Sequence, residues 1–299
     1  MTDTFDVSRI TLGAVQLGLP YGAVPTSPMP NEVETQDLLS AAWEAGINAV
    51  DTARTYGLSE ERIGRWLGKT TLPLAIATKF PELPADAVSG AQALRQYYAE
   101  SQAALGGAPF RYYLAHHAPD IMRPEIQDTL RALQSAGQID CFGASVYTLS
   151  EAEDALSVPD LGALQIPISL ADQRFVDAGI IAAAAAQGVV VFARSVFLQG
   201  VLLREPAALP ALFEPALPCL SKFGQCCADL GISKLSAALF AVDTVPGIAS
   251  MVIGVNRPSQ LEEIKTAFLA AHEMDKTAIE TLRETMTTFP ADLRDPRDW

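Results

Sequence analysis

The chain has 299 residues, 49% of them hydrophobic, and a formal net charge of −14. Length alone would permit two domains, but α/β barrels commonly fill this length as one domain. The acidic balance argues against nucleic-acid binding and against attachment to an anionic membrane surface, because both need clustered Lys and Arg side chains.

Cysteine and histidine usage gives no sign of a disulfide framework or a metal site. The four cysteines are Cys141, Cys219, Cys226 and Cys227. Their spacing matches neither pattern, so we expect a reducing compartment and no bound metal. The first residues, MTDTFDVSRI, lack the apolar region of a signal peptide, and the longest apolar stretch, Ile180–Ala193, is too short to span a membrane. These features predict a cytoplasmic protein without a membrane partner.

Short apolar runs typical of strands alternate with longer segments of helical spacing. The expected strands are Ile10–Val15, Ile47–Asp51, Leu74–Lys79, Tyr112–His116, Cys141–Ser145, Ala163–Ile168, Val189–Arg194 and Met251–Gly254. The clearest helices are Val33–Ala45, Gly90–Leu105, Glu125–Ala136 and Ser259–Ala271. The alternation predicts a parallel sheet, and eight repeats favour a single-domain (β/α)8 TIM barrel over a doubly wound sheet. No G-x-G-x-x-G turn follows any of these strands, which weakens a Rossmann interpretation.

Local signals predict several helix ends. Gly46, Gly137 and Gly188 are placed to end helices in a left-handed conformation. Ser59 is expected to cap the helix that follows it, with Glu60 near the positive end of that helix.

The C-terminal third is expected to add structure to the barrel. Pro206–Pro218 is predicted to be a long loop near the barrel mouth, followed by helices around Ser221–Leu230 and Lys234–Val242. A further helix, Thr277–Thr288, precedes the tail Asp292–Trp299. The prediction is one domain over residues 1–299, with an extra helix and tail at about 275–299.

Titratable side chains gather at the predicted strand ends in the first half of the chain. Asp51, Lys79 and His116 each end a strand, and Tyr56 follows Asp51 in the next loop. In a barrel these positions share one rim. Carbonyl reduction needs a proton donor, and a nearby ammonium group would lower the tyrosine pKa from about 10. Lys79 is expected to supply that charge, with Asp51 holding the lysine and a histidine orienting the carbonyl oxygen.

Longer strings resemble the aldo-keto reductase superfamily, in particular one bacterial branch. The most specific string is DTARTYGLSEERIG, from Asp51 to Gly64; ATK, ending at Lys79, resembles the third-strand lysine motif. LGAVQLGLPYG precedes these strings near the start of the chain, and GASVY, LQIPISLADQRF, RSVFLQGVL and IGVNRPSQLEEI follow them in the order expected. The resemblance covers nearly the whole chain and implies a hydride transfer between a nicotinamide cofactor and a carbonyl or alcohol substrate, in either direction.

The resemblance also implies a catalytic tetrad of Asp51, Tyr56, Lys79 and a histidine. Alignment on the strand YYLAH favours His116, whereas alignment on an H-x-P pattern favours His117. We prefer His116. The two rings should point to opposite sides of an extended strand, so only one of them is expected to face the site.

Positions that hold the cofactor are implied in the same way. They are Ser145, Gln165, Arg194, Ser195, Leu198, Gly200, Gly254, Asn256, Arg257, Gln260 and Glu263. Ser145 and Gln165 match residues that hold the nicotinamide amide, but Val146 stands where many relatives have asparagine. Arg194 stands where many have an aromatic side chain that stacks on nicotinamide. Ser195, Leu198 and Gly200 fall in the loop along the pyrophosphate.

The end of the last expected strand bears on cofactor preference. Gly254, Asn256 and Arg257 precede a helix start that suits a phosphate group. Gln260 and Glu263 match positions near the adenosine end, and Gln260 replaces an arginine of many NADP-preferring relatives. The family's habit favours NADPH, with Arg257 as a candidate for the 2′-phosphate, and NADH remains an alternative.

Two other functions stay open at this stage. One is a lyase that uses Lys79 as a Schiff base, which would need a lysine without a tight carboxylate partner. The other is a nicotinamide-binding regulatory subunit with little turnover. Substrate choice is expected to depend on mouth segments Leu19–Pro30, Leu202–Pro218 and Ala291–Trp299, with Tyr21 and Trp299 as candidate contacts. The substrate and the oligomeric state are left open.

Overall fold

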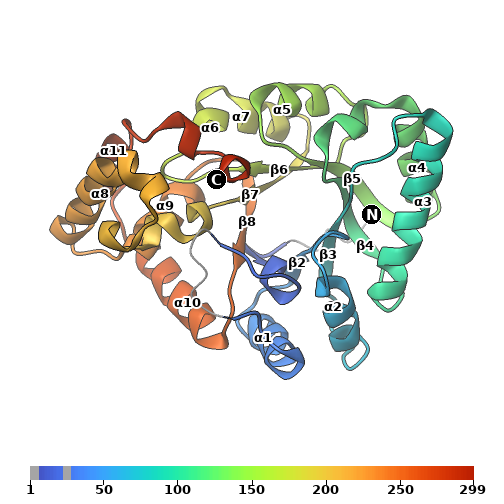
Figure 1. Ribbon diagram of the computed structural model, residues 1–299, viewed down its shortest axis with the longest axis horizontal. Helices are drawn as coiled ribbons and strands as arrows, with labels where there is room; N and C mark the ends of the chain where they lie inside the picture. Colours follow the sequence, from blue (N-terminus) through green and yellow to red (C-terminus); the bar gives the residue numbers. More distant parts are fainter. Residues whose placement is uncertain (1–6, 23–27) are drawn as a thin grey trace.

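Eight parallel strands close into a barrel in the order in which they occur in the chain, and β1 pairs with β8 (Figure 1). This computed structural model describes residues 7–22 and 28–299. The strands are β1 (Ile10–Gly13), β2 (Ala49–Asp51), β3 (Ala75–Phe80), β4 (Phe110–Ala115), β5 (Ile139–Ser145), β6 (Ala163–Pro167), β7 (Val190–Arg194) and β8 (Ile248–Gly254). The predicted (β/α)8 barrel is confirmed, and each strand overlaps the run expected for it.

Helices surround the barrel and follow the strands along the chain (Figure 1). They are α1 (Glu32–Glu44), α2 (Ser59–Leu67), α3 (Ala87–Ala104), α4 (Pro124–Ser135), α5 (Leu149–Leu156), α6 (Arg174–Asp177), α7 (Ile180–Ala186), α9 (Lys234–Asp243) and α10 (Pro258–His272). Two further helices, α8 (Leu217–Asp229) and α11 (Lys276–Thr285), pack against α9 on one side of the barrel. The helix α11 overlaps the expected segment Thr277–Thr288.

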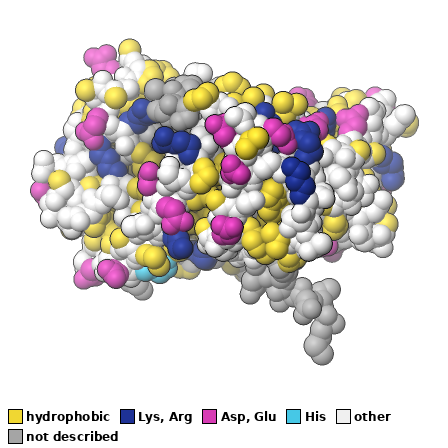
Figure 2. All heavy atoms as spheres, turned by 90° about the horizontal axis from the view of Figure 1, so that it is seen from below, with side chains coloured by type: hydrophobic (Ala, Val, Ile, Leu, Met, Phe, Trp, Pro, Cys, Tyr) yellow, Lys and Arg dark blue, Asp and Glu magenta, His cyan; other side chains and the backbone are white. Residues whose placement is uncertain are grey.

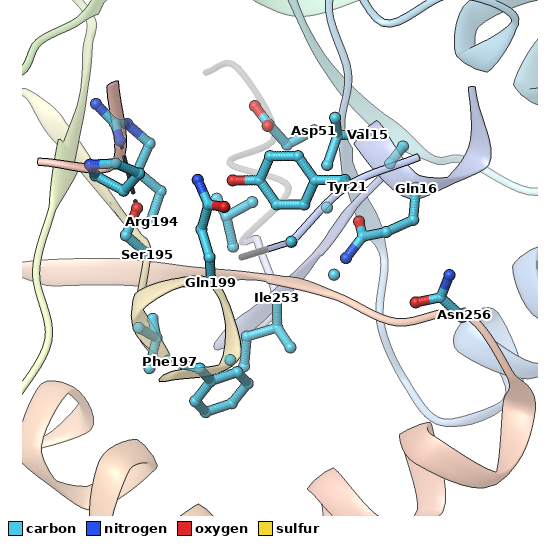
Figure 3. Close-up of a pocket in the computed structure, with 18 of the residues that line it drawn as sticks. Val15, Gln16, Tyr21, Asp51, Arg194, Ser195, Phe197, Gln199, Ile253 and Asn256 are labelled. Atoms are coloured by element: carbon cyan, nitrogen blue, oxygen red, sulfur yellow. Dashed lines mark hydrogen bonds between the residues drawn. The ribbon is translucent and has the colours of Figure 1, made fainter. Parts of the chain in front are cut away.

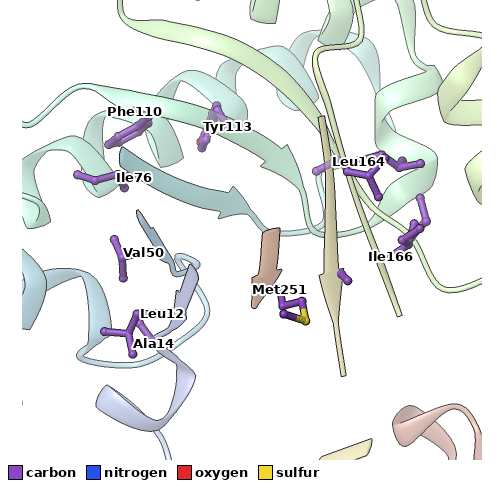
Figure 4. Close-up of a cluster of buried hydrophobic side chains, with 14 of the residues drawn as sticks. Leu12, Ala14, Val50, Ile76, Phe110, Tyr113, Leu164, Ile166 and Met251 are labelled. Carbon is purple, nitrogen blue, oxygen red and sulfur yellow. The ribbon is translucent and has the colours of Figure 1, made fainter. Parts of the chain in front are cut away.

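Side chains alternate along each strand between the outer face and the barrel interior. Outward residues such as Val50, Ile76 and Leu164 form the main core with the helices (Figure 4). Inward residues such as Tyr112 and Phe192 fill the barrel, with their rings edge to face at 4.9 Å. This filling makes the interior a packed core, so any cavity must lie at an end of the barrel.

The start of α2 differs from the expectation that Ser59 caps it. Ser59 is the first residue of the helix, and its N-cap residue is Leu58. The Ser59 hydroxyl lies 2.9 Å from the Thr52 hydroxyl and donates to the Ala14 carbonyl oxygen, also at 2.9 Å. The side chain therefore ties α2 to the ends of β1 and β2 instead of capping its own helix.

The segment Pro206–Pro218 is more ordered than the predicted loop. It holds two short 3-10 turns, Pro206–Ala208 and Ala211–Ala216, and α8 begins at Leu217. Phe213 is buried in a second apolar cluster formed with α8, α9 and α11. Burial of this apolar surface explains why a Pro-rich segment takes up regular turns.

On the face shown in Figure 2, Lys and Arg side chains are interspersed with Asp and Glu side chains and do not gather in one patch. Within residues 7–22 and 28–299, no single helix has the length and apolar composition needed to cross a membrane. One bent pair, Ala211–Asp229 with Lys234–Asp243, meets that test by length and composition.

Candidate active site

A cavity of about 750 Å³ opens at the C-terminal ends of the strands. Its walls come from strand ends, from the loop after β7 and from the chain terminus near Arg297. In Figure 3, Arg194 and Ser195 lie on one side, Gln16 and Asn256 on the other, and Tyr21 between them. A cavity of this size falls in the range that proteins use for small molecules and cofactors.

The strand alternation explains which residues reach the cavity. Asp51, Ser145, Arg194 and Gly254 are the last residues of β2, β5, β7 and β8, and all four line the cavity. Register places Gly13 opposite both Asp51 and Gly254. Each of these positions lies an even number of residues after an inward-facing residue of the same strand, so its own side also faces the barrel interior. The sequence-predicted positions therefore converge because they share both a strand end and a side of the sheet.

Asp51 and Lys79 form a buried ion pair beneath the cavity. Lys79 Nζ donates to both Asp51 carboxylate oxygens, at 2.7 and 2.8 Å, and to the Thr52 carbonyl oxygen at 2.9 Å. Burial lowers the pKa of Lys79, and the Asp51 charge opposes that shift. Lys79 is fully buried and does not line the cavity, so Asp51 separates it from the open space.

Tyr56 and His116 lie together at the cavity wall. Their ring centroids are 5.7 Å apart with an interplanar angle of 83°, and Lys79 Nζ lies 5.1 Å from the Tyr56 ring centroid. His116 Nδ1 is 3.1 Å from the Thr55 hydroxyl oxygen. His117 instead pairs with Asp120 at 3.3 Å and lies outside the cavity lining. The geometry therefore places His116, and not its neighbour, beside Tyr56.

Burial determines the protonation of both rings. It raises the pKa of Tyr56 above its ordinary value, and the Asp51 charge adds to that rise. The fall of the Tyr56 pKa that was expected from Lys79 is not found, because burial is the largest cause and raises that pKa. Burial, together with the charges of Lys79 and Arg194, lowers the pKa of His116 to about 3. At neutral pH the site therefore holds a protonated phenol and an uncharged imidazole.

A hydrogen-bonded chain links the ion pair to the ends of β5 and β6. Gln165 Nε2 donates to Asp51 Oδ1 at 2.8 Å, and the Ser145 hydroxyl donates to Gln165 Oε1 at 3.2 Å. All three side chains line the cavity. Ser145 and Gln165 thus lie at the cavity wall beside the Asp51–Lys79 pair.

Arg194 takes part in a stack of three side chains. Its guanidinium carbon lies 3.8 Å from the Tyr147 ring centroid, and that of Arg297 lies 3.7 Å from the same centroid. Two guanidinium groups that both lie within 4 Å of one ring centroid must occupy opposite faces of that ring. Arg194 also donates to the Val146 carbonyl oxygen at 2.8 Å.

The loop after β7 lines the cavity only in part. Ser195, Gln199 and Gly200 border it. Leu198 does not, because its side chain is buried in the second apolar cluster. The assignment of Leu198 to the cofactor site is therefore not supported at the level of its side chain.

The start of α10 also divides the predicted residues. Asn256 and Gln260 line the cavity, whereas Arg257 and Glu263 are exposed outside it. Gln260 Oε1 accepts hydrogen bonds from the backbone N–H groups of Asn256, at 2.7 Å, and Arg257, at 3.2 Å. These two donors, expected to be open to a phosphate, are thus satisfied by a side chain of the helix itself.

Several lining residues were missed by sequence reasoning. Gln16 follows β1, Tyr147 follows Ser145 by two positions, and Arg297 comes from the chain terminus. Gln16 stands within the string LGAVQLGLPYG, which was used only to support the family resemblance. Tyr21 lines the cavity as expected, but Trp299 packs against Phe213 with ring centroids 4.9 Å apart. Part of the first mouth segment, residues 23–27, lies outside the described residues.

The fold and the site together define a (β/α)8 barrel with a polar cavity at the C-terminal ends of its strands, where enzymes of this fold carry their active sites. The model of the aldo/keto reductase family matches residues 9–286. The chain therefore belongs to the aldo/keto reductase family, a family of carbonyl oxidoreductases.

Solved structures agree with this assignment. A putative aldo-keto reductase from Pseudomonas aeruginosa is 25% identical, with a TM-score of 0.68 over 89% of this chain and 92% of that one. A glycerol dehydrogenase from Gluconobacter oxydans is 20% identical, with a TM-score of 0.75 over 97% and 94%. An aldo-keto reductase from Bacillus halodurans is 19% identical, with a TM-score of 0.76 over 97% and 96%. The last two support the fold alone.

Proposed function

We propose that this protein is a nicotinamide-dependent oxidoreductase that reduces an aldehyde or ketone to an alcohol, or runs the reverse reaction, with Tyr56 as the proton donor and acceptor. The observation that carries the proposal is the placement of Tyr56 between His116 and the Asp51–Lys79 pair at the wall of the cavity. These groups come from the loop after β2 and from three strand ends, so the fold alone brings them together.

The cavity residues fit a nicotinamide dinucleotide. Ser145 and Gln165 offer an amide-binding pair, and Ser195 and Gly200 border the path toward α10. A Cβ at Gly254 would displace the Gln16 side-chain amide, so glycine leaves room for this amide at the wall. The Gln16 side-chain oxygen is buried without a hydrogen-bond partner among the described residues. When bound, the cofactor supplies the hydride; the protein supplies binding and the proton.

The raised pKa of Tyr56 keeps the phenol protonated across the physiological range. In reduction, the Tyr56 hydroxyl donates this proton to the carbonyl oxygen as that oxygen gains negative charge. The nearby Lys79 ammonium stabilises the resulting phenolate, and Asp51 keeps the lysine charged in its buried place. His116, uncharged, orients the carbonyl oxygen by a hydrogen bond.

The geometry argues against a Schiff-base lyase. Such an enzyme needs an uncharged lysine that a carbonyl substrate can reach. Lys79 is fully buried, makes three hydrogen bonds and does not line the cavity. The regulatory-subunit alternative has no observation that favours it over the reductase.

For the cofactor we propose NADPH, with NADH as the alternative. The exposed Arg257 at the start of α10 is the candidate partner of the 2′-phosphate, which only NADPH carries. Replacement of Arg257 by alanine should weaken NADPH binding by roughly ten-fold or more, the effect of losing a charge-assisted hydrogen bond, and leave NADH binding unchanged. Titration of each cofactor by fluorescence measures this. Equal losses for both cofactors would remove Arg257 from the site.

The direct test of the proposed reaction is isotopic. NADPH and NADH deuterated at the nicotinamide C4 position are incubated with the protein and a panel of aldehydes and ketones, and the products are analysed by mass spectrometry. The proposal expects deuterium on the carbinol carbon of the product alcohol. Cofactor binding without transfer to any member of the panel, in either reaction direction, would instead support a binding role.

A further inference from the structure

Charges at the cavity wall are almost all neutralised. The charged residues that line it are Asp51, Arg194, Arg204, Glu205 and Arg297. Asp51 pairs with Lys79 at 2.7 Å, Glu205 with Lys234 at 2.9 Å, and Arg297 with Asp295 at 2.6 Å. Arg204 is not free either.

Arg194 is the exception. Among the described residues no carboxylate lies within ion-pair distance of Arg194; its charge acts on Asp295, but Asp295 pairs with Arg297. Its two hydrogen bonds go to uncharged oxygens, Val146 O at 2.8 Å and the Ser195 hydroxyl at 3.4 Å. A guanidinium group carries five N–H donors, so most of its capacity is unused. Its Nε is buried without a hydrogen-bond partner in the described chain. Half-burying a cation without a counter-charge is unfavourable, and an incoming anion would offset that cost.

The stack on Tyr147 holds this cation in a fixed orientation. The Tyr147 ring covers one face of the Arg194 guanidinium, while Arg297 covers the far face of the ring. Val146 O holds one edge of the guanidinium. A planar cation fixed in this way at the cavity wall does not have to lose side-chain freedom when a ligand binds.

Arg194 also lines the same cavity as Tyr56 and His116. Its positive charge contributes to the lowered pKa of His116 and opposes the raised pKa of Tyr56. Figure 3 shows Arg194 on the side of the cavity opposite Gln16 and Asn256. An anion bound at the start of α10 would therefore lie across the cavity from Arg194.

We propose that Arg194 determines substrate specificity by binding a carboxylate or phosphate group that the carbonyl substrate carries near its reacting carbon. The inference rests on the proposed carbonyl reductase function. Both anions match the planar N–H fork of arginine, which binds carboxylate and phosphate oxygens in pairs. A neutral carbonyl substrate would leave the cation uncompensated, so the cavity favours acidic aldehydes and ketones over neutral ones of the same size.

The first test measures binding without turnover. Calorimetry compares benzoate and phenyl phosphate with the uncharged benzamide on the wild type, Arg194→Gln and Arg194→Lys, with and without NADPH. The affinity for the anions is expected to fall roughly ten- to hundred-fold in Arg194→Gln and to recover in part in Arg194→Lys. The affinity for benzamide is expected to change little in either variant. The preferred anion identifies the group as carboxylate or phosphate. Unchanged anion binding in Arg194→Gln, or an equal loss of NADPH binding, overturns the proposal.

The second test uses matched substrates. The kcat/KM values for 4-oxobutanoate and butanal, and for glyceraldehyde 3-phosphate and glyceraldehyde, are compared in the wild type and Arg194→Gln. The proposal expects Arg194→Gln to lose at least ten-fold on one charged substrate and little on its neutral partner. The control variant Arg131→Gln removes the same charge from α4, where Arg131 contacts Asp160. It should not change the ratio of kcat/KM between the charged and the neutral member of either substrate pair.

The two proposals fail in different ways. Turnover of neutral and charged partners with equal kcat/KM in both proteins overturns the role of Arg194 and leaves the reductase standing. Absence of all turnover counts against the reductase, and the calorimetric comparison then still decides whether Arg194 holds an anion.

Discussion

Lys79 is the residue on which the catalytic arrangement depends. It is fully buried, and three hydrogen bonds stabilise its ammonium group. Two of them go to the Asp51 carboxylate and one to the Thr52 carbonyl oxygen. The sequence predicted Asp51, Tyr56, Lys79 and His116 because each stands in a recognisable string near a strand end. It predicted a lowered pKa for Tyr56, whereas burial raises that pKa, and burial is decided by residues far away in the chain.

Breaking the Asp51–Lys79 pair should destabilise the fold. Lys79→Met leaves a buried carboxylate without its counter-charge, which typically costs about 3–5 kcal/mol. Asp51→Asn combined with Lys79→Met removes both charges and should regain most of that loss. Urea unfolding of the three proteins measures the free energies. A double variant as unstable as Lys79→Met would show that the buried pair is not the source of the effect.

The lowered pKa of His116 predicts a flat pH profile. A histidine with a pKa of about 3 stays uncharged throughout the range in which histidines usually titrate, so kcat/KM for reduction should not change between about pH 5 and pH 8 on its account. Tyr56 adds no step there, because its pKa is raised. Steady-state kinetics across this range checks the expectation.

The control for this profile is His117→Asn, since His117 lies outside the cavity lining and pairs with Asp120. It should reproduce the wild-type profile. A step near pH 6.5 in the wild type that persists in His117→Asn and disappears in His116→Asn would mean that His116 gains a proton in the working range.

At the scale of elements, the site depends on close contact between the ends of β1 and β2. The turn Val15–Leu17 after β1 packs against the loop that carries Tyr56, and the Arg62 guanidinium on α2 donates to Leu17 O at 2.6 Å. A Cβ at Gly18 would collide with the Tyr56 carbonyl oxygen. Sequence patterns predicted both strands but not this contact, because no local signal reports how two loops meet.

Gly18→Ala should therefore move the Tyr56 loop without unfolding the barrel. A displacement of about 1 Å in a catalytic group can cost about a hundred-fold in rate, so kcat should fall by up to that factor. Gly68→Ala is the matched control, because a Cβ there meets its nearest atom at 3.5 Å, an ordinary contact. Steady-state kinetics with circular dichroism checks both. Full activity in Gly18→Ala would show that the loop position does not limit the reaction.

At the scale of the whole molecule, the barrel and most of the site followed from two regularities: strands alternating with helices, and inward-facing residues at strand ends. Leu198 and Trp299 departed from the prediction because Leu198 is buried in the cluster around α8 and α11 and Trp299 packs against that cluster. The Arg194–Tyr147–Arg297 stack was not foreseen either. It joins β7, the segment after β5 and the chain terminus, and no single stretch of sequence contains that information.

The most direct measurement of the central claim compares NADPH and NADH oxidation by the wild type, Tyr56→Phe and Tyr97→Phe with a panel of aldehydes. Tyr97, on α3, lies outside the cavity lining and serves as the control. The account predicts turnover that falls about 10²–10⁴-fold in Tyr56→Phe, with cofactor binding retained, and that is unchanged in Tyr97→Phe. Turnover that does not depend on Tyr56 would contradict the assignment of the proton donor and, with it, the proposed chemistry of the site.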